Sequence, residues 1–239
     1  MSSPSVFAEA TEALAAGVLG AFDGTEDAVR PARYVDDSSD PLAALAAIRV
    51  LGADVLAPHL LAGRPFLAED AAVMAKAFDA FPAADSTEEA TVAWRDWAAA
   101  QLLSVAAKDP APHRPAPAAG TVTDSTDWRP WSVRMSQLAP LATTGLDGPV
   151  HDAARTGALP LSRGVTRSLL RRDFPTAARL VRWLAWLRYE GVELPLDPAL
   201  AAEHIWLVGG AGPRTALDLV IARHLLGARP GTGEKAERT

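Results

Sequence analysis

The chain contains no cysteine and no asparagine, and only three of its 23 basic residues are lysine. The lack of cysteine excludes disulfides, thiolate metal sites, iron–sulfur clusters and cysteine nucleophiles, and it favours a cytoplasmic location. The preference for arginine, together with the heavy use of alanine, is typical of a GC-rich genome. An arginine is therefore not by itself a sign of a functional site in this sequence.

Signals for membranes and nucleic acids are also scarce. Inspection finds no apolar run close to the roughly 20 residues that cross a bilayer, and no basic segment precedes an apolar one near residue 1. We therefore expect no signal peptide and no membrane association. A net charge of −6 disfavours non-specific nucleic-acid binding. A helix-turn-helix over residues 162–188 is also disfavoured, because its second helix would present leucine, tryptophan and valine instead of the polar side chains of a DNA-recognition helix.

No run of alternating β-branched residues predicts a strand, whereas Asp-Pro pairs that begin helices alternate with glycines that end them. Asp40-Pro41 and Asp197-Pro198 are two such starts, and Asp54 is expected to cap a further short helix. The sequence therefore predicts an all-α protein, a compact multi-helix bundle of about ten helices in two packed halves.

The boundary between the halves is expected at residues 109–123, because this proline- and alanine-rich stretch suits neither a helix nor a central strand. The prediction is an acidic helical half over 1–108, the connection 109–123, an arginine-rich helical half over 124–227 and a disordered tail over 228–239. Residues 1–120 carry 17 acidic and 8 basic side chains, and residues 121–239 carry 12 and 15. This asymmetry fits either two halves that attract each other or an anionic ligand in the second half.

The stretch 161–191 holds the densest arginine cluster and reads as two successive helices. Ser162 is expected to cap the first helix and Asp173 the second, and Gly191 is expected to end the second. The second helix is apolar almost all round, which predicts that it is buried. Its narrow remaining sector contains Arg179, Arg182 and Trp186.

Arginines also line one face of the first of these helices, since Arg163, Arg167 and Arg171 are four residues apart. Like charges at this spacing repel unless acidic side chains or a bound anion neutralise them. Asp173 is the single acidic residue between positions 155 and 188. The neutraliser is therefore expected to be the acidic half or a ligand.

Two short motifs resemble those of known enzymes. Asp36-Asp37-Ser38-Ser39-Asp40 is similar to the DDxxD motif with which class I terpene synthases and prenyltransferases hold magnesium and a diphosphate. The second metal motif of that family is absent, and helix capping by Asp40 explains the residues more simply. His151-Asp152 resembles the pair of the HD phosphohydrolases, but the further histidines of that family are missing.

Three polar residues fall on apolar stripes of their predicted helices. Asp96 lies in line with Val92 and Leu103, His204 with Leu200 and Leu207, and His224 with Leu217 and Ile221. Burial shifts the pKa of such groups towards the values that acid–base catalysis uses. The alternatives are a buried ion pair for Asp96 and a hydrogen bond to a backbone carbonyl for each histidine.

These observations favour a pocket protein for a small anion carrying phosphate, sulfate or carboxylate, and an enzyme of specialised metabolism in particular. Asp96 or His204 would move a proton, in an elimination, cyclisation or hydrolysis that needs no metal and no redox cofactor. The anion would be held and the site walled by Arg167, Arg171, Arg182, Trp183 and Trp186. The alternatives are a non-catalytic helical subunit that docks a protein partner, in a homo- or hetero-oligomer, and a magnesium–diphosphate enzyme that uses the DDxxD motif.

Overall fold

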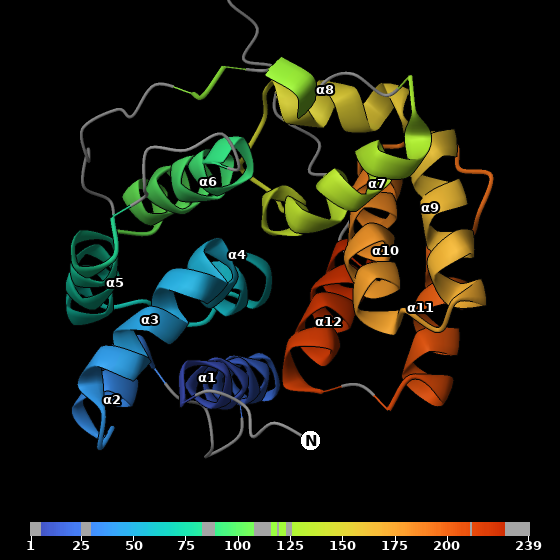
Figure 1. Cartoon of the computed structure of the whole chain (residues 1–239). Helices are drawn as coiled ribbons and strands as arrows, with labels where there is room; N and C mark the ends of the chain where they lie inside the picture. The colour runs from blue at the N-terminus through green and yellow to red at the C-terminus, as the bar shows by residue number, and fades with distance from the viewer. Residues whose placement is uncertain are drawn as a thin grey trace, which may run out of the picture.

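A computed structural model describes residues 6–24, 30–82, 89–107, 116–118, 120–122, 126–210 and 212–227. These residues form helices that pack into one bundle, and no strand occurs among them, so the all-α prediction is confirmed (Figure 1). The elements in chain order are α1 Val6–Asp23, α2 Pro31–Asp36, α3 Pro41–Leu51, η1 Gly52–Leu56 (η denotes a 3-10 helix), α4 Ala57–Ala62, α5 Ala68–Ala80, α6 Glu89–Ala107, η2 Gly120–Val122, α7 Trp128–Gln137, η3 Ala139–Leu141, α8 Pro149–Thr156, α9 Ala158–Leu170, α10 Phe174–Tyr189, α11 Pro198–Val208 and α12 Pro213–Gly227.

Aspartates begin four of these helices: Asp127 precedes α7, and the other three follow the predicted Asp-Pro and Asp-x-Pro patterns. Asp40, Asp173 and Asp197 precede α3, α10 and α11, and each carboxylate accepts hydrogen bonds of 2.8 to 3.3 Å from backbone N–H groups of the first turn. Such bonds satisfy donors that have no partner within the helix. Gly191 follows α10 with a φ of 82°, the left-handed conformation that glycine adopts without strain.

Two of the expected caps are wrong. α9 begins at Ala158 rather than at Ser162, whose hydroxyl donates a 2.8 Å hydrogen bond to the Ala158 carbonyl from inside the helix. Asp54 lies within η1 instead of preceding a helix, and its carboxylate contacts Arg182. In both cases the helical segment starts earlier than its capping residue suggested.

Helix α10 is the centre of the second half, because α7, α9, α11 and α12 all pack against it. Every residue from Leu180 to Leu187 is buried, as the nearly continuous apolar surface of this helix predicts. Helix α12 extends this core into the first half, where it packs against α1 and α4. The two halves are therefore joined by shared packing.

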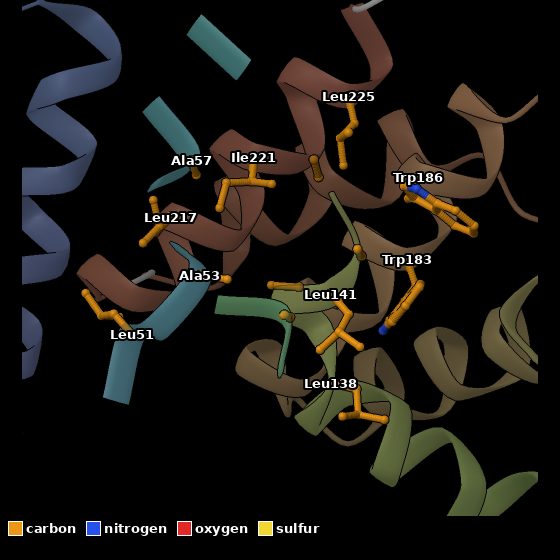
Figure 2. Close-up of a cluster of buried hydrophobic side chains, with 14 of the residues drawn as sticks. Leu51, Ala53, Ala57, Leu138, Leu141, Trp183, Trp186, Leu217, Ile221 and Leu225 are labelled. Atoms are coloured by element: carbon orange, nitrogen blue, oxygen red, sulfur yellow. The ribbon is translucent and has the colours of Figure 1, made fainter. Parts of the chain in front are cut away.

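A single hydrophobic cluster crosses the junction of the halves. Figure 2 shows Leu51 and Ala53 of the first half beside Leu217 and Ile221 of α12. A polar contact accompanies this packing at the start of α12, where the Glu12 carboxylate of α1 accepts a 3.2 Å hydrogen bond from the Arg214 N–H. The domain boundaries stay a prediction, since most of residues 109–123 and all of 228–239 lie outside the described residues.

Glycine sets the distance between α9 and its neighbours. A Cβ atom added at Gly164 would lie 2.8 Å from the Ser132 Cβ of α7 and 3.0 Å from the Leu180 Cδ1 of α10. Real side chains do not approach so closely. The position of α9 against α7 and α10 therefore depends on a glycine at this point.

One stretch of the chain is long and apolar enough to span a membrane. By length and composition Pro41–Ala62, which comprises α3, η1 and α4, could cross a bilayer, contrary to the expectation that no such run exists. Most of it is buried inside the bundle, as in the core helix of a soluble protein.

Candidate functional site

A small polar pocket lies where the two halves meet, and we call it the junction pocket. Its volume is about 110 Å³. The acidic half supplies α3, η1 and α6, and the arginine-rich half supplies α7, η3, α10 and α12. The lining residues are Val50, Leu51, Asp54, Arg95, Ser136, Gln137, Ala139, Pro140, Arg179, Arg214, Leu217 and Asp218.

Arg182 is buried directly behind this pocket, with 1% of its side chain exposed. Its Nη1 lies 2.7 Å from Asp54 Oδ1 and donates a 3.3 Å hydrogen bond to Asp218 Oδ1. The other nitrogens donate to the carbonyls of Ala142 and Pro140, at 3.1 and 3.4 Å. A buried guanidinium requires this degree of satisfaction, so Arg182 serves to hold the two carboxylates in place.

Asp218 is the titratable group of the pocket. Burial raises its pKa from 3.8 to about 6, and the neighbouring Asp54 carboxylate acts in the same direction, while Arg182 and Arg179 oppose the rise. The Arg179 Nε is 3.8 Å from its second carboxylate oxygen. A carboxyl group with a pKa near 6 can both release and accept a proton close to neutral pH.

Three guanidinium groups converge on the pocket from three different helices. Arg95 comes from α6 and donates a hydrogen bond to the Val50 carbonyl, Arg179 comes from α10, and Arg214 comes from the first turn of α12. Burial lowers the pKa of Arg95, and repulsion from Arg214 and Arg179 adds to this effect, although Asp54 opposes it. With Arg182 behind the wall, four positive charges face two carboxylates. The pocket therefore has an excess of positive charge.

Asp96, the first predicted proton carrier, is buried as its stripe predicts, but it belongs to a different cluster. Arg49 of α3 donates a 2.6 Å hydrogen bond from Nη2 to Asp96 Oδ2, and its Nη1 is 2.6 Å from the other oxygen. The same guanidinium donates to the Phe81 carbonyl and lies 4.7 Å from the Phe78 ring centre. This two-pronged contact is the ion pair given above as the alternative to catalysis.

His204, the second predicted proton carrier, is exposed, so the expectation that it faces the core is wrong. Its stripe companions Leu200 and Leu207 are also exposed, at 66% and 75%. The opposite face of α11, which carries Ala201 and Ile205, packs inward instead. The inward face combines the small Ala201 and Ala202 with Ile205, and Leu200 and Leu207 lie on the outer face.

His151 and His224 are satisfied by backbone carbonyls. His224 is half-buried, with its Nδ1 3.0 Å from the Val220 carbonyl. His151 is fully buried, and its Nε2 is 3.0 Å from the Leu141 carbonyl. Burial lowers the pKa of His151, which keeps it neutral. Neither histidine lines the junction pocket.

Trp183 and Trp186 are core residues whose rings pack against His151, with ring-centre distances of 5.7 and 5.0 Å. The Trp183 indole N–H donates a 2.8 Å hydrogen bond to the Met135 carbonyl. Arg155 covers the other tryptophan at 5.0 Å from the ring centre. Neither tryptophan lines the junction pocket, so of the predicted binding residues only Arg182 is near it.

Arg167 lies elsewhere, on α9, and Arg171 directly follows that helix. Figure 1 shows the position of α9 in the bundle. Both arginines border a broad, largely apolar depression of about 650 Å³, which we call the α9 groove. The groove is lined by Trp128, Leu159, Ser162, Arg163, Thr166, Arg167, Leu170, Arg171, Pro195 and Leu196. The predicted set of binding residues is thus divided between two sites.

The DDxxD residues have structural roles in the fold. Asp36 ends the short helix α2, which was not predicted, and Asp40 caps α3. Among the described residues no group of three histidine or acidic side chains is placed to hold a metal ion.

Sequence reasoning passed over Asp218 and Arg95, whereas Arg214 stands in the sequence beside the glycine-rich residues 209–212, which resemble an anion-cradling loop but were interpreted as a helix stop and turn. A signal for Asp218 was present, because it is the single acidic residue between Glu203 and Glu234 and it lies in an apolar helix. The same criterion had singled out Asp96. No local pattern distinguishes Arg95, since its grouping with Arg214 depends on how α6 and α12 are placed in the fold.

Comparisons with protein families, with curated proteins and with solved structures found no match to this chain.

Proposed function

We propose that the junction pocket binds a small anion of the phosphate, sulfate or carboxylate type, and that the protein is an enzyme that moves a proton through Asp218. The observation that carries this proposal is the convergence of Arg95, Arg179 and Arg214 on one space beside a carboxyl group. Planar guanidinium groups match the oxygens of such anions in pairs. A bound anion would also relieve the repulsion among the three.

The size of the pocket limits the ligand. Sites for drug-sized molecules typically have volumes of about 300–1,000 Å³, and the junction pocket has about 110 Å³. We infer that it takes a single inorganic ion, or the anionic group of a small acid whose remainder extends outwards. Residues from both halves line it, so the ligand would also hold the halves together.

Asp218 takes over the role that the sequence suggested for Asp96 or His204. The Asp96 carboxylate is engaged in its ion pair with Arg49, and His204 is exposed on the outer face of α11. Protonated Asp218 would donate a proton to the bound substrate, and the ionised form would accept a proton from it. Elimination, cyclisation and hydrolysis all suit this chemistry, and none of them requires a redox cofactor.

Sulfate is a suitable first probe, because it keeps its charge over the working pH range. We expect sulfate to raise the melting temperature and to give a calorimetric binding signal with the unaltered protein. Arg214→Gln should abolish both effects, because it removes a pocket cation whose backbone contact to Glu12 is retained. Arg188→Gln is the matched control, since Arg188 is exposed on α10 and does not line the pocket. Equal sulfate binding by the two variants would contradict the proposal.

A further inference from the structure

The α9 groove has the form of a docking surface rather than of a small-molecule site. Its apolar lining includes Leu159 and Leu170, which are 48% and 82% exposed. Large apolar side chains so accessible on a well-packed helix are expected where another surface covers them. Leu196, from the connection between α10 and α11, also lines the groove.

A row of positive charge follows the length of this groove. Arg163, Arg167 and Arg171 occur at intervals of one helical turn, and all three line it. Within the described part of the chain, no carboxylate forms a salt bridge with any of them. The nearest acidic candidate, Asp173, shares an adjoining depression with Arg167 and Arg171, but its carboxylate caps α10. Their neutralising charges are therefore expected to come from another molecule.

We propose that the α9 groove binds an acidic amphipathic helix of a protein partner, with its leucine-type side chains on the groove floor and its carboxylates facing the three arginines. The spacing of the three arginines favours a helix as the occupant. Successive arginines are about 6 Å apart along α9, close to the 5.4 Å pitch of a helix, so a partner helix can present one carboxylate to each. A small amphiphile with one anionic head would engage only part of the row.

The length of the groove supports the same occupant. The lining residues of α9 run from 159 to 171, about 18 Å of helix, which corresponds to three turns of a partner. Apolar anchors at turn intervals, flanked by charges, are how helices are recognised in grooves. This interaction is independent of anion binding in the junction pocket, which shares no lining residue with the groove.

The test uses a fluorescent helical peptide of about 15 residues, with a leucine stripe and three glutamates spaced four residues apart. A second peptide has glutamine at the glutamate positions, and a third has the same composition with the glutamates adjacent. We expect the full-length protein to bind the first peptide at least about tenfold more tightly than either of the others, and less tightly as salt is added.

Protein variants locate the binding. Arg163→Gln, Arg167→Gln and Arg171→Gln combined should weaken peptide binding about tenfold or more, and Leu170→Ser alone should weaken it several-fold. Neither variant should alter the melting temperature much, because these side chains are mostly exposed. The control combines Arg33→Gln, Arg188→Gln and Arg223→Gln, which remove the same charge from exposed positions outside the groove.

Several results would overturn the proposal. Equal binding of the glutamate and glutamine peptides would remove the role of charge, and unchanged binding by the groove variants would place the peptide elsewhere. Self-association that is lost in the triple groove variant, measured by sedimentation velocity, would assign the groove to a second copy of the chain. Binding to anionic vesicles without binding to the peptide would assign it to a membrane surface.

Discussion

Arg182 on α10 and Asp54 on η1 join the two halves of the chain, with 2.7 Å between the guanidinium Nη1 and the carboxylate Oδ1. This contact is one answer to how the arginine-rich segment is neutralised, because the carboxylate comes from the acidic half. Asp218, from the arginine-rich half itself, supplies the second. Among the described residues, the arginines that line the α9 groove form no salt bridge with a carboxylate. The arginine-rich segment therefore contains Arg182, which is neutralised within the fold, and a group of arginines that is not.

The first prediction concerns the buried Arg182. Arg182→Met should lower the free energy of unfolding by about 3–5 kcal/mol, because the buried Asp54 and Asp218 carboxylates lose the cation that contacts both of them. The loss should be smaller at about pH 5 than at pH 8, since Asp218 is then largely protonated. Denaturant titrations at both pH values measure this. Arg188→Met, on the exposed side of the same helix, is expected to stay within about 0.5 kcal/mol. A similarly small effect of Arg182→Met would show that the network is not structural.

The second prediction separates stability from catalysis at Asp96. Asp96→Ala should cost about 3 kcal/mol or more, because Arg49 then keeps a charge in a site that is 15% exposed. Glu69→Ala, which breaks an exposed pair with Arg30, should cost less than about 1 kcal/mol. Thermal or chemical unfolding of both variants gives the comparison. A mild effect at Asp96, with loss of any activity, would return this residue to the catalytic candidates.

How much of this could be read from the sequence depends on where each determinant lies. Helix starts at Asp40, Asp173 and Asp197 were predictable, because a cap and its proline are neighbours in the chain. The burial of Asp96 followed from its stripe, but its partner Arg49 lies 47 residues away and no periodicity connects them.

Helix α11 shows a different failure, in which the pattern is present but its burial was predicted wrongly. Its stripe through His204 is real, yet the helix is apolar on more than one face. Periodicity identifies a face but does not say which face is covered. The face with Ala201 and Ile205 packs inward, so Leu200, His204 and Leu207 face outwards. The junction pocket could not be predicted from the sequence, because its residues come from seven elements spread over the chain.

The third prediction concerns the pH dependence of stability. The pKa of Asp218 is about 6 in the folded protein against an ordinary value of 3.8, so between about pH 4 and pH 6 the folded state binds more protons than the unfolded state. The contribution of this group to stability must therefore fall as the pH rises through that window. We expect the unfolding free energy of the unaltered protein to fall relative to that of Asp218→Asn as the pH rises through this range. A rise relative to Asp218→Asn would mean that the arginines outweigh burial.

The fourth prediction tests the close contact of α9. Gly164→Ala should destabilise the protein by about 1–3 kcal/mol, because the new methyl group would meet Ser132 at 2.8 Å and α7 would have to shift. This loss should outweigh the better helix propensity of alanine. Gly227→Ala is the control, since nothing lies within 4 Å of the added atom. Denaturant titration of both variants should place Gly164→Ala well below Gly227→Ala, and equal stabilities would contradict the packing.

The last prediction links the anion to the proton. An anion beside Asp218 repels its carboxylate, so it binds better when that group is protonated, and the pKa of about 6 places this change between pH 5 and pH 7.5. Sulfate should therefore bind several-fold more tightly at the lower pH. Asp218→Asn, which resembles the protonated acid in shape and lacks its charge, should bind sulfate at both pH values and lose the dependence. Calorimetric titrations of the two proteins at each pH provide the measurement. If sulfate bound to Asp218→Asn with the pH dependence of the unaltered protein, the titrating group would be elsewhere and Asp218 would have no part in the site.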